Sequence, residues 1–191
     1  MKTVCVYLGA QFGNDNEYSD AAILLGKKIA ADGYTLVYGG SSLGMMGLLA
    51  NTVKEYGGRV VGIITNHLIE QEKPLKILDE LHVVDSMQQR KAMMQKISDM
   101  FIVMPGGLGT LEEALETWNA IKIGELTKPI GFLNINGYFD GLFSFVNLCE
   151  QAGFLTTRAR NIPISSSNIP LLWNEMLEQN KSGHSVSNSE V

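Results

Sequence analysis

The sequence predicts an α/β fold, a doubly wound and mostly parallel sheet with helices on both faces. Three observations indicate this class. Short apolar runs recur without the alternation of half-exposed strands, helical periods separate them, and glycines follow several of the runs. Continuous apolar runs are typical of parallel strands buried on both faces, and alternation of strand and helix gives βαβ units with right-handed crossovers.

Six runs rich in β-branched and apolar residues are the expected strands. They lie at 4–8 (VCVYL), 35–39 (TLVYG), 59–64 (RVVGII), 81–84 (LHVV), 100–104 (MFIVM) and 129–135 (PIGFLNI). In open α/β sheets, ligands bind beyond the carboxyl ends of the strands, where the strand order reverses. The glycines at these ends are Gly9, Gly39, Gly40, Gly106, Gly107 and Gly109. We therefore expect the binding crevice there.

Helices are expected between the strands. A 3.6-residue period joins two sets of side chains, Tyr18, Ala22, Leu25 and Ile29 after the first strand and Leu111, Ala114, Leu115, Trp118 and Ile121 after the fifth. Another helix is expected to begin near Gly44, and one more within 86–99. These segments complete the βαβ pattern.

The bulk composition indicates one globular domain. The chain has 191 residues, of which 45% are hydrophobic and 18% charged, enough for a substantial core. No composition shift or internal repeat marks a second domain, so 1–180 is expected to form a single α/β domain. The polar segment 181–191 is expected to be a disordered tail, with His184 a loop residue rather than a ligand.

Charge and cysteine content exclude several classes of protein. A net charge of −5 and a pI near 5.2 disfavour a nucleic-acid binder, which needs clustered Lys and Arg. We expect no signal sequence and no membrane span, and a cytoplasmic location. Cys5 and Cys149 stand apart without CxxC spacing, so both are expected in the core as free thiols. His67, in a turn-like segment, and His82 lack companions at metal-ligand spacing; we expect no metal and no cofactor.

Two glycine-rich loops are candidate anion sites. In "GGSSLGMMG", Met45 and Met46 stand where a P-loop needs Lys and Ser or Thr, and in "GGLGTLEE" Glu112 takes the place of the third glycine of a dinucleotide fingerprint. What remains is a strand, a glycine turn and a helix N-terminus, whose free N–H groups and dipole suit a phosphate. Turn geometry alone is the other interpretation of these glycines.

Thr110 and Glu113 match the T-x-x-E spacing of a capping box. Thr110 would then cap the following helix, and Glu113 would reach back to the capping residue. A chemical role for Glu113 is the alternative, and the two are compatible.

Arg90 lies in the middle of an apolar stripe, three residues after Met87 and four before Met94. Either its stem passes the methionines to reach solvent, or the guanidinium meets an anion in the interior, because a buried unpaired charge is very costly. Lys91 and Lys96 are expected to be exposed on the same helix. Met87, Met93 and Met94 are expected to pack the core, although methionines also suit a pocket for a flat base.

Several segments together resemble the LOG family, the cytokinin-activating phosphoribohydrolases often mislabelled lysine decarboxylases. "PGGLGTLEE" matches the PGGxGTxxE signature, "SMQQRKAMMQKISDMFIVMPGG" matches the segment before it, "YGGSSLGMMG" resembles the YGGGxxGLMG loop, and "KPIGFLNINGYFDGL" resembles the stretch that follows. The resemblance runs from about Val4 to about Leu155.

The resemblance implies a Rossmann-like homodimer that hydrolyses the N-glycosidic bond of a nucleoside 5′-monophosphate, AMP or an N6-prenylated AMP. It implies Arg90 and Glu113 as the catalytic pair. The substrate contacts that it implies are Glu72, placed in the loop before the fourth strand, Lys91, Gly40, Ser41, Gly106, Gly107, Leu108, Gly109 and Thr110.

Three departures from the family pattern bear on base preference. Gln88 replaces a histidine, Ser41 replaces a glycine and Leu108 replaces a tyrosine found in many members.

A non-catalytic nucleotide carrier or sensor of the same fold is the alternative function; it would not need both Arg90 and Glu113. A lysine decarboxylase is disfavoured because nothing in the sequence singles out a Schiff-base lysine.

Overall fold

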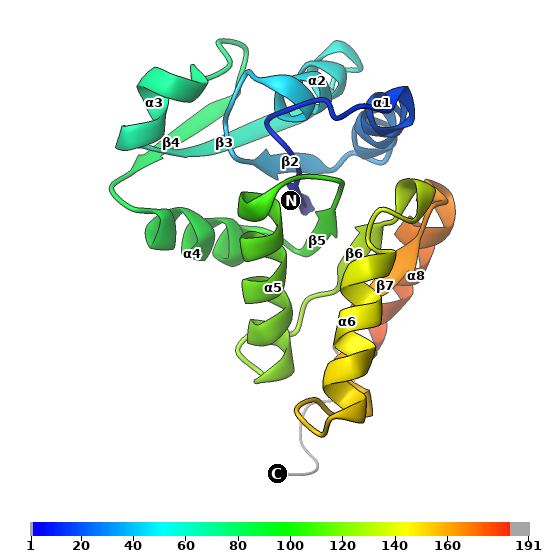
Figure 1. Ribbon diagram of the computed structural model, residues 1–191. Helices are drawn as coiled ribbons and strands as arrows, with labels where there is room; N and C mark the ends of the chain where they lie inside the picture. The colour runs from blue at the N-terminus through cyan, green and yellow to red at the C-terminus, as the bar shows by residue number, and fades with distance from the viewer. Residues whose placement is uncertain (1, 184–191) are drawn as a thin grey trace.

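The computed structural model describes residues 2–183 and contains one seven-stranded sheet (Figure 1). Every pair of neighbouring strands is parallel, in the order β4-β3-β2-β1-β5-β6-β7. The strands are β1 (Thr3–Tyr7), β2 (Thr35–Tyr38), β3 (Arg59–Thr65), β4 (Glu80–Val84), β5 (Met100–Val103), β6 (Ile130–Leu133) and β7 (Ile164–Ser166).

The helices connect successive strands. They are α1 (Asn16–Ala31), α2 (Gly44–Glu55), α3 (Asn66–Glu72), α4 (Met87–Ile97), α5 (Leu108–Lys122), α6 (Asp140–Gln151), α7 (Thr157–Arg160) and α8 (Ile169–Gly183), with a short 3₁₀ turn η1 (Ile135–Gly137) before α6. The expected doubly wound α/β class is confirmed.

Two apolar clusters, one on each face of the sheet, form the core. On one face, side chains of β1 such as Val4 and Val6 pack against α1, α2 and α8. On the other face, Cys5 and Tyr7 belong to a cluster with side chains of α4, α5 and α6 (Figure 1). Successive residues of β1 therefore point into the two clusters in turn. Because both faces of the central strands are buried in this way, these strands are continuously apolar.

The edge strands differ from the sequence-based expectation. β4 has exposed and half-buried residues only, so the prediction that all six runs are buried on both faces is wrong there. The seventh strand, β7, was not predicted, because its three residues are too short and too polar to form an apolar run. An edge strand has a neighbour on one side only, which allows a more polar sequence.

The strand order reverses between β1 and β5, which are adjacent although far apart in sequence. From β1 the chain continues to β2, β3 and β4 on one side of β1. It then returns from β4, and β5 pairs with β1 on the other side. Beyond the last pair of the register, Tyr7 with Val103, the two loops stay joined because Gly9 N donates to Pro105 O at 3.2 Å. This topological switch point is where such sheets bind ligands.

Helix α8 ends at Gly183, and most of the expected tail, His184 included, lies outside the described residues. Within 2–183, no helix combines the length and apolar character required to cross a bilayer. Cys5 and Cys149 are both free thiols; Cys5 is buried as expected, whereas Cys149 is only half-buried, so its expected place in the core is wrong. His67 lies in α3 rather than in a turn, a correction that follows from the Thr65 hydroxyl, which accepts a hydrogen bond from Leu68 N and caps this helix.

Candidate active site

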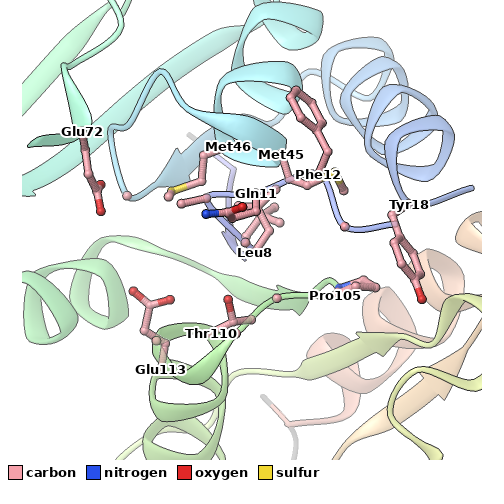
Figure 2. A pocket seen from close by; sticks show the side chains of 18 of the residues that line it. Leu8, Gln11, Phe12, Tyr18, Met45, Met46, Glu72, Pro105, Thr110 and Glu113 are labelled. Carbon is pink, nitrogen blue, oxygen red and sulfur yellow. The ribbon is translucent and has the colours of Figure 1, made fainter. Parts of the chain in front are cut away.

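A cavity of about 470 Å³ opens at the switch point. Its walls come from the loops after β1, β2 and β5 and from side chains of α2, α4 and α5. Figure 2 shows two carboxylates, Glu72 and Glu113, at one end and the rings of Phe12 and Tyr18 at the other. The side chains between them include Met45 and Met46, so the cavity joins a charged end to an apolar end.

Glu113 faces this cavity from the second turn of α5, and its side chain is almost fully buried. Helix α5 begins earlier than predicted, with Gly107 as its N-cap and no side-chain cap. Thr110 is therefore inside the helix, and the predicted capping box is wrong. Glycine forms the turn here without a capping side chain, which leaves Glu113 free of any capping contact.

Burial raises the pKa of Glu113 to about 7. Arg90 and Lys91 act against this shift through their positive charge, while Glu112 and Glu72 add to it through theirs. A carboxyl group with a pKa near 7 holds and releases a proton readily at neutral pH, which is the property of a general acid or base.

Arg90 is buried in α4 and lines the cavity. Its Nε donates to Ile63 O at 3.0 Å and its Nη2 donates to Gly39 O at 3.1 Å, while Nη1 lies 3.7 Å from the Met87 sulfur. The alternative in which the stem reaches solvent is excluded. The carbonyl groups of Ile63, within β3, and of Gly39, just after β2, anchor the guanidinium at the cavity wall, and its remaining N–H groups are available to a ligand.

Glu72 approaches the cavity from the opposite side. It is the last residue of α3, whereas the prediction placed it in the loop before the fourth strand. Glu72 lines the cavity, which is the position that a substrate contact requires. Its Oε2 atom is buried and has no hydrogen-bond partner among the described residues. Its backbone carbonyl accepts hydrogen bonds from Ser41 Oγ at 3.2 Å and Ser42 N at 3.3 Å. A buried acceptor without a partner suits a ligand that brings hydroxyl or N–H donors.

The N-terminus of α5 forms the floor between these groups. Gly106, Gly107, Gly109 and Thr110 line the cavity as predicted. Because Gly107 caps the helix without a side chain, the first amides of α5 are free to meet an anion, and the helix dipole favours it.

We expect Gly106→Ala to disrupt this floor. A methyl group at Gly106 would lie 2.2 Å from Thr110 Oγ1 and 2.8 Å from Gly9 N, so the loop must move, at a typical cost of about 1–3 kcal/mol. KM for a phosphorylated ligand should rise. Gly141→Ala in α6 is the control because its added methyl meets open space; equal kinetics in the two variants would contradict the expectation.

The aromatic end of the cavity was not predicted as part of the site. Tyr138, from the turn after β6, donates from its hydroxyl to Gly106 O at 2.6 Å and packs edge-on against Tyr18, with ring centroids 5.7 Å apart. Phe12 and Tyr18 come from the loop after β1 and the start of α1. Of these loops, only the one after β6 was part of a segment that resembles the family, and that pattern does not show which aromatic ring points into the cavity.

Four predicted substrate contacts lie outside the lining of the cavity. Lys91 is buried rather than exposed and pairs with Glu112 and Glu116. Leu108 is 87% exposed. Gly40, with φ of 77°, lets the chain turn against β3, and buried Ser41 bonds Glu72 O instead of facing the cavity. No lysine of residues 2–180 lines the cavity, whereas pyridoxal chemistry needs a lysine for its Schiff base.

Comparisons with known proteins identify the family of this chain. The family model described as "Possible lysine decarboxylase" matches residues 46–176. The chain is 43% identical over 165 residues to the probable cytokinin riboside 5′-monophosphate phosphoribohydrolase LOG6 of Arabidopsis thaliana, covering 86% of this chain and 82% of that protein. This chain belongs to the LOG family. The rice (Oryza sativa subsp. japonica) cytokinin riboside 5′-monophosphate phosphoribohydrolase LOG is 41% identical, over 86% of this chain and 68% of its own length.

The LOG-family fold also occurs in more distant proteins. The molybdenum cofactor carrier protein of Chlamydomonas reinhardtii superposes with a TM-score of 0.71 at 19% identity, covering 95% of this chain and 98% of that one. At this identity the likeness concerns the fold alone. Among the described residues of the LOG-family chain, no group of three or more His, Cys, Asp or Glu side chains is arranged to hold a metal ion.

Proposed function

We propose that this protein hydrolyses the N-glycosidic bond of a nucleoside 5′-monophosphate, AMP or an N6-prenylated AMP, to free base and ribose 5-phosphate. One observation carries the proposal: buried Glu113 shares a cavity with Arg90 and with the uncapped N-terminus of α5. The names of the relatives, cytokinin riboside 5′-monophosphate phosphoribohydrolases, support the same substrate class.

The phosphate occupies the α5 N-terminus, where Gly106, Gly107 and Gly109 allow close approach of the backbone amides. The ribose then lies beside Glu113, further along the same helix, and its hydroxyls donate to Glu113 and to the unpartnered Oε2 of Glu72. Fixing the phosphate and the sugar places C1′ and the attacking water in a reactive arrangement before the bond breaks, which lowers the entropic part of the barrier.

The bond between C1′ and the base nitrogen breaks with its electron pair on the base, and positive charge develops on the ribose. Carboxylate Glu113 stabilises that charge and accepts one proton from the water whose oxygen bonds to C1′. The same proton passes to the departing base, so the reaction consumes one water and regenerates the carboxylate. Arg90 holds the phosphate or the departing base through its free N–H groups.

We further propose that the protein is a cytoplasmic homodimer. The two free cysteines, one fully buried, suit a reducing compartment. The exposed apolar side chains Leu115 of α5 and Phe145 and Leu148 of α6 supply surface for a second copy. Analytical ultracentrifugation tests the dimer.

The experiment is chromatographic detection of free base and ribose 5-phosphate after incubation with AMP or with N6-isopentenyl-AMP. Adenosine is the control, because it lacks the phosphate that the α5 N-terminus binds. We expect release from at least one nucleotide and little from adenosine. Binding of both nucleotides without release of base would contradict hydrolysis and support a carrier or sensor.

A further inference from the structure

Helices α4 and α5 are joined behind the cavity by a set of polar contacts. Lys91 Nζ lies 2.7 Å from Glu112 Oε1 and 2.5 Å from Glu116 Oε2. One turn further along, Gln95 Nε2 donates to Thr117 Oγ1 at 3.2 Å. We call these five side chains the α4–α5 seam.

In the α4–α5 seam, the Lys91 side chain is more buried than the two carboxylate side chains that it contacts. The Lys91 side chain is 7% exposed, against 57% for Glu112 and 43% for Glu116. Burial lowers the pKa of Lys91, but hydrogen bonds and charge from Glu112 and Glu116 outweigh burial and raise it. A buried ammonium held by two carboxylates is fixed in place far more firmly than a lysine on an open surface.

The chain neighbours of these residues are the two groups at the centre of the proposed reaction. Arg90 precedes Lys91 on α4, and Glu113 follows Glu112 on α5. Both Arg90 and Glu113 line the cavity, whereas Lys91, Glu112 and Glu116 do not. The seam therefore ties together the two helical turns that carry the guanidinium and the carboxyl group.

We propose that Lys91 is a positioning residue, which joins α4 to α5 and sets Arg90 relative to Glu113, and that it does not contact the substrate phosphate. The inference rests on the proposed function. Both acceptors of Lys91 belong to α5, so its ammonium group is already neutralised without a ligand. The phosphate instead meets the backbone amides at the start of α5.

Loss of the seam lets α4 and α5 shift by a fraction of a helical turn. A displacement of about 1 Å between reacting groups costs up to about 100-fold in rate. A positioning role therefore predicts that the lysine and its two carboxylate partners act as one unit, because removing either side breaks the same contact.

The test compares Lys91→Met, the pair Glu112→Gln with Glu116→Gln, all three together, and Lys91→Arg. Initial rates on AMP give kcat and KM, and calorimetry gives Kd for AMP and for adenosine. Lys54→Met is the matched control, because it breaks the Lys54–Asp79 ion pair, which joins α2 to the loop before β4.

We expect Lys91→Met and the double glutamine variant to lower kcat by similar factors, about 10-fold or more, with no further loss in the triple variant. Lys91→Arg should retain part of the rate, and the preference for AMP over adenosine should be unchanged throughout. Selective loss of AMP affinity in Lys91→Met, with normal kcat in the glutamine pair, would overturn the inference. If the unchanged protein releases base from neither AMP nor N6-isopentenyl-AMP, the proposed function is overturned, and the inference with it.

Discussion

Glu113→Gln is expected to lower kcat for base release by about 10²- to 10⁴-fold, the range of a lost general acid or base. Glutamine has nearly the same shape and still accepts hydrogen bonds from ribose hydroxyls, so KM should change little. It neither takes a proton from water nor carries the negative charge that stabilises the developing cation. Steady-state kinetics beside Glu55→Gln, an exposed carboxylate at the end of α2, measures the effect; an unchanged kcat would contradict the role of Glu113.

The same substitution should stabilise the fold above neutral pH. The folded-state pKa of Glu113 is about 7, against an ordinary value of 4.5, so the folded protein holds this proton more tightly than the unfolded chain. Its contribution to stability is complete below pH 4.5 and is lost as pH rises through 7. Glutamine stays neutral, so the variant should gain up to about 3 kcal/mol over the unchanged protein at pH 8 and almost nothing at pH 4.

Urea unfolding at the two pH values measures this difference. Arg90 and Lys91 oppose the shift, and Glu72 and Glu112 add to it, so these four groups must remain intact in the comparison. A pH-independent difference between the two proteins would show that the carboxyl of Glu113 titrates normally, and the proton transfer proposed for it would lose its basis.

The fold was predictable because its causes are local. Glycine turns and continuous apolar strands repeat along the chain, and each βαβ unit has one favoured hand. β7 escaped prediction since three residues carry too little pattern. The edge position of β4 was missed for another reason: which strand ends a sheet depends on the order of the strands, which no single run encodes.

The site was predictable only in part. Gly106, Gly107, Gly109 and Thr110 lie close together in sequence, so their common position at the cavity follows from one helix N-terminus. Tyr138 reaches Gly106 O from 32 residues away, and no periodicity signals such a contact. Lys91 was misjudged because its partners, Glu112 and Glu116, belong to another helix. Sequence spacing predicts neighbours on one element, and the pairing of two elements must come from tertiary structure.

Arg90→Met is expected to lower kcat/KM by about 10²- to 10³-fold, the range for one lost electrostatic contact to the transition state. It should also lower the free energy of unfolding, since Ile63 O and Gly39 O lose their donors at about 1–3 kcal/mol each where water does not replace them. Thermal melting and kinetics on the same preparation separate the two effects. A lower melting temperature with unchanged kcat/KM would leave Arg90 a purely structural role.

Two further measurements distinguish chemistry from packing at Arg90. Its positive charge opposes the raised pKa of Glu113, so Arg90→Met should move the midpoint of the pH–rate profile upward, which a simple packing defect would not do. In Arg90→Ala, the shortened side chain leaves room beside Gly39 O, and added guanidinium ion should restore part of the rate at concentrations too low to unfold the protein. Methylammonium carries the same charge without the planar fork that spans two carbonyls and a ligand. Rescue by guanidinium and not by methylammonium therefore assigns the effect to the geometry of the group.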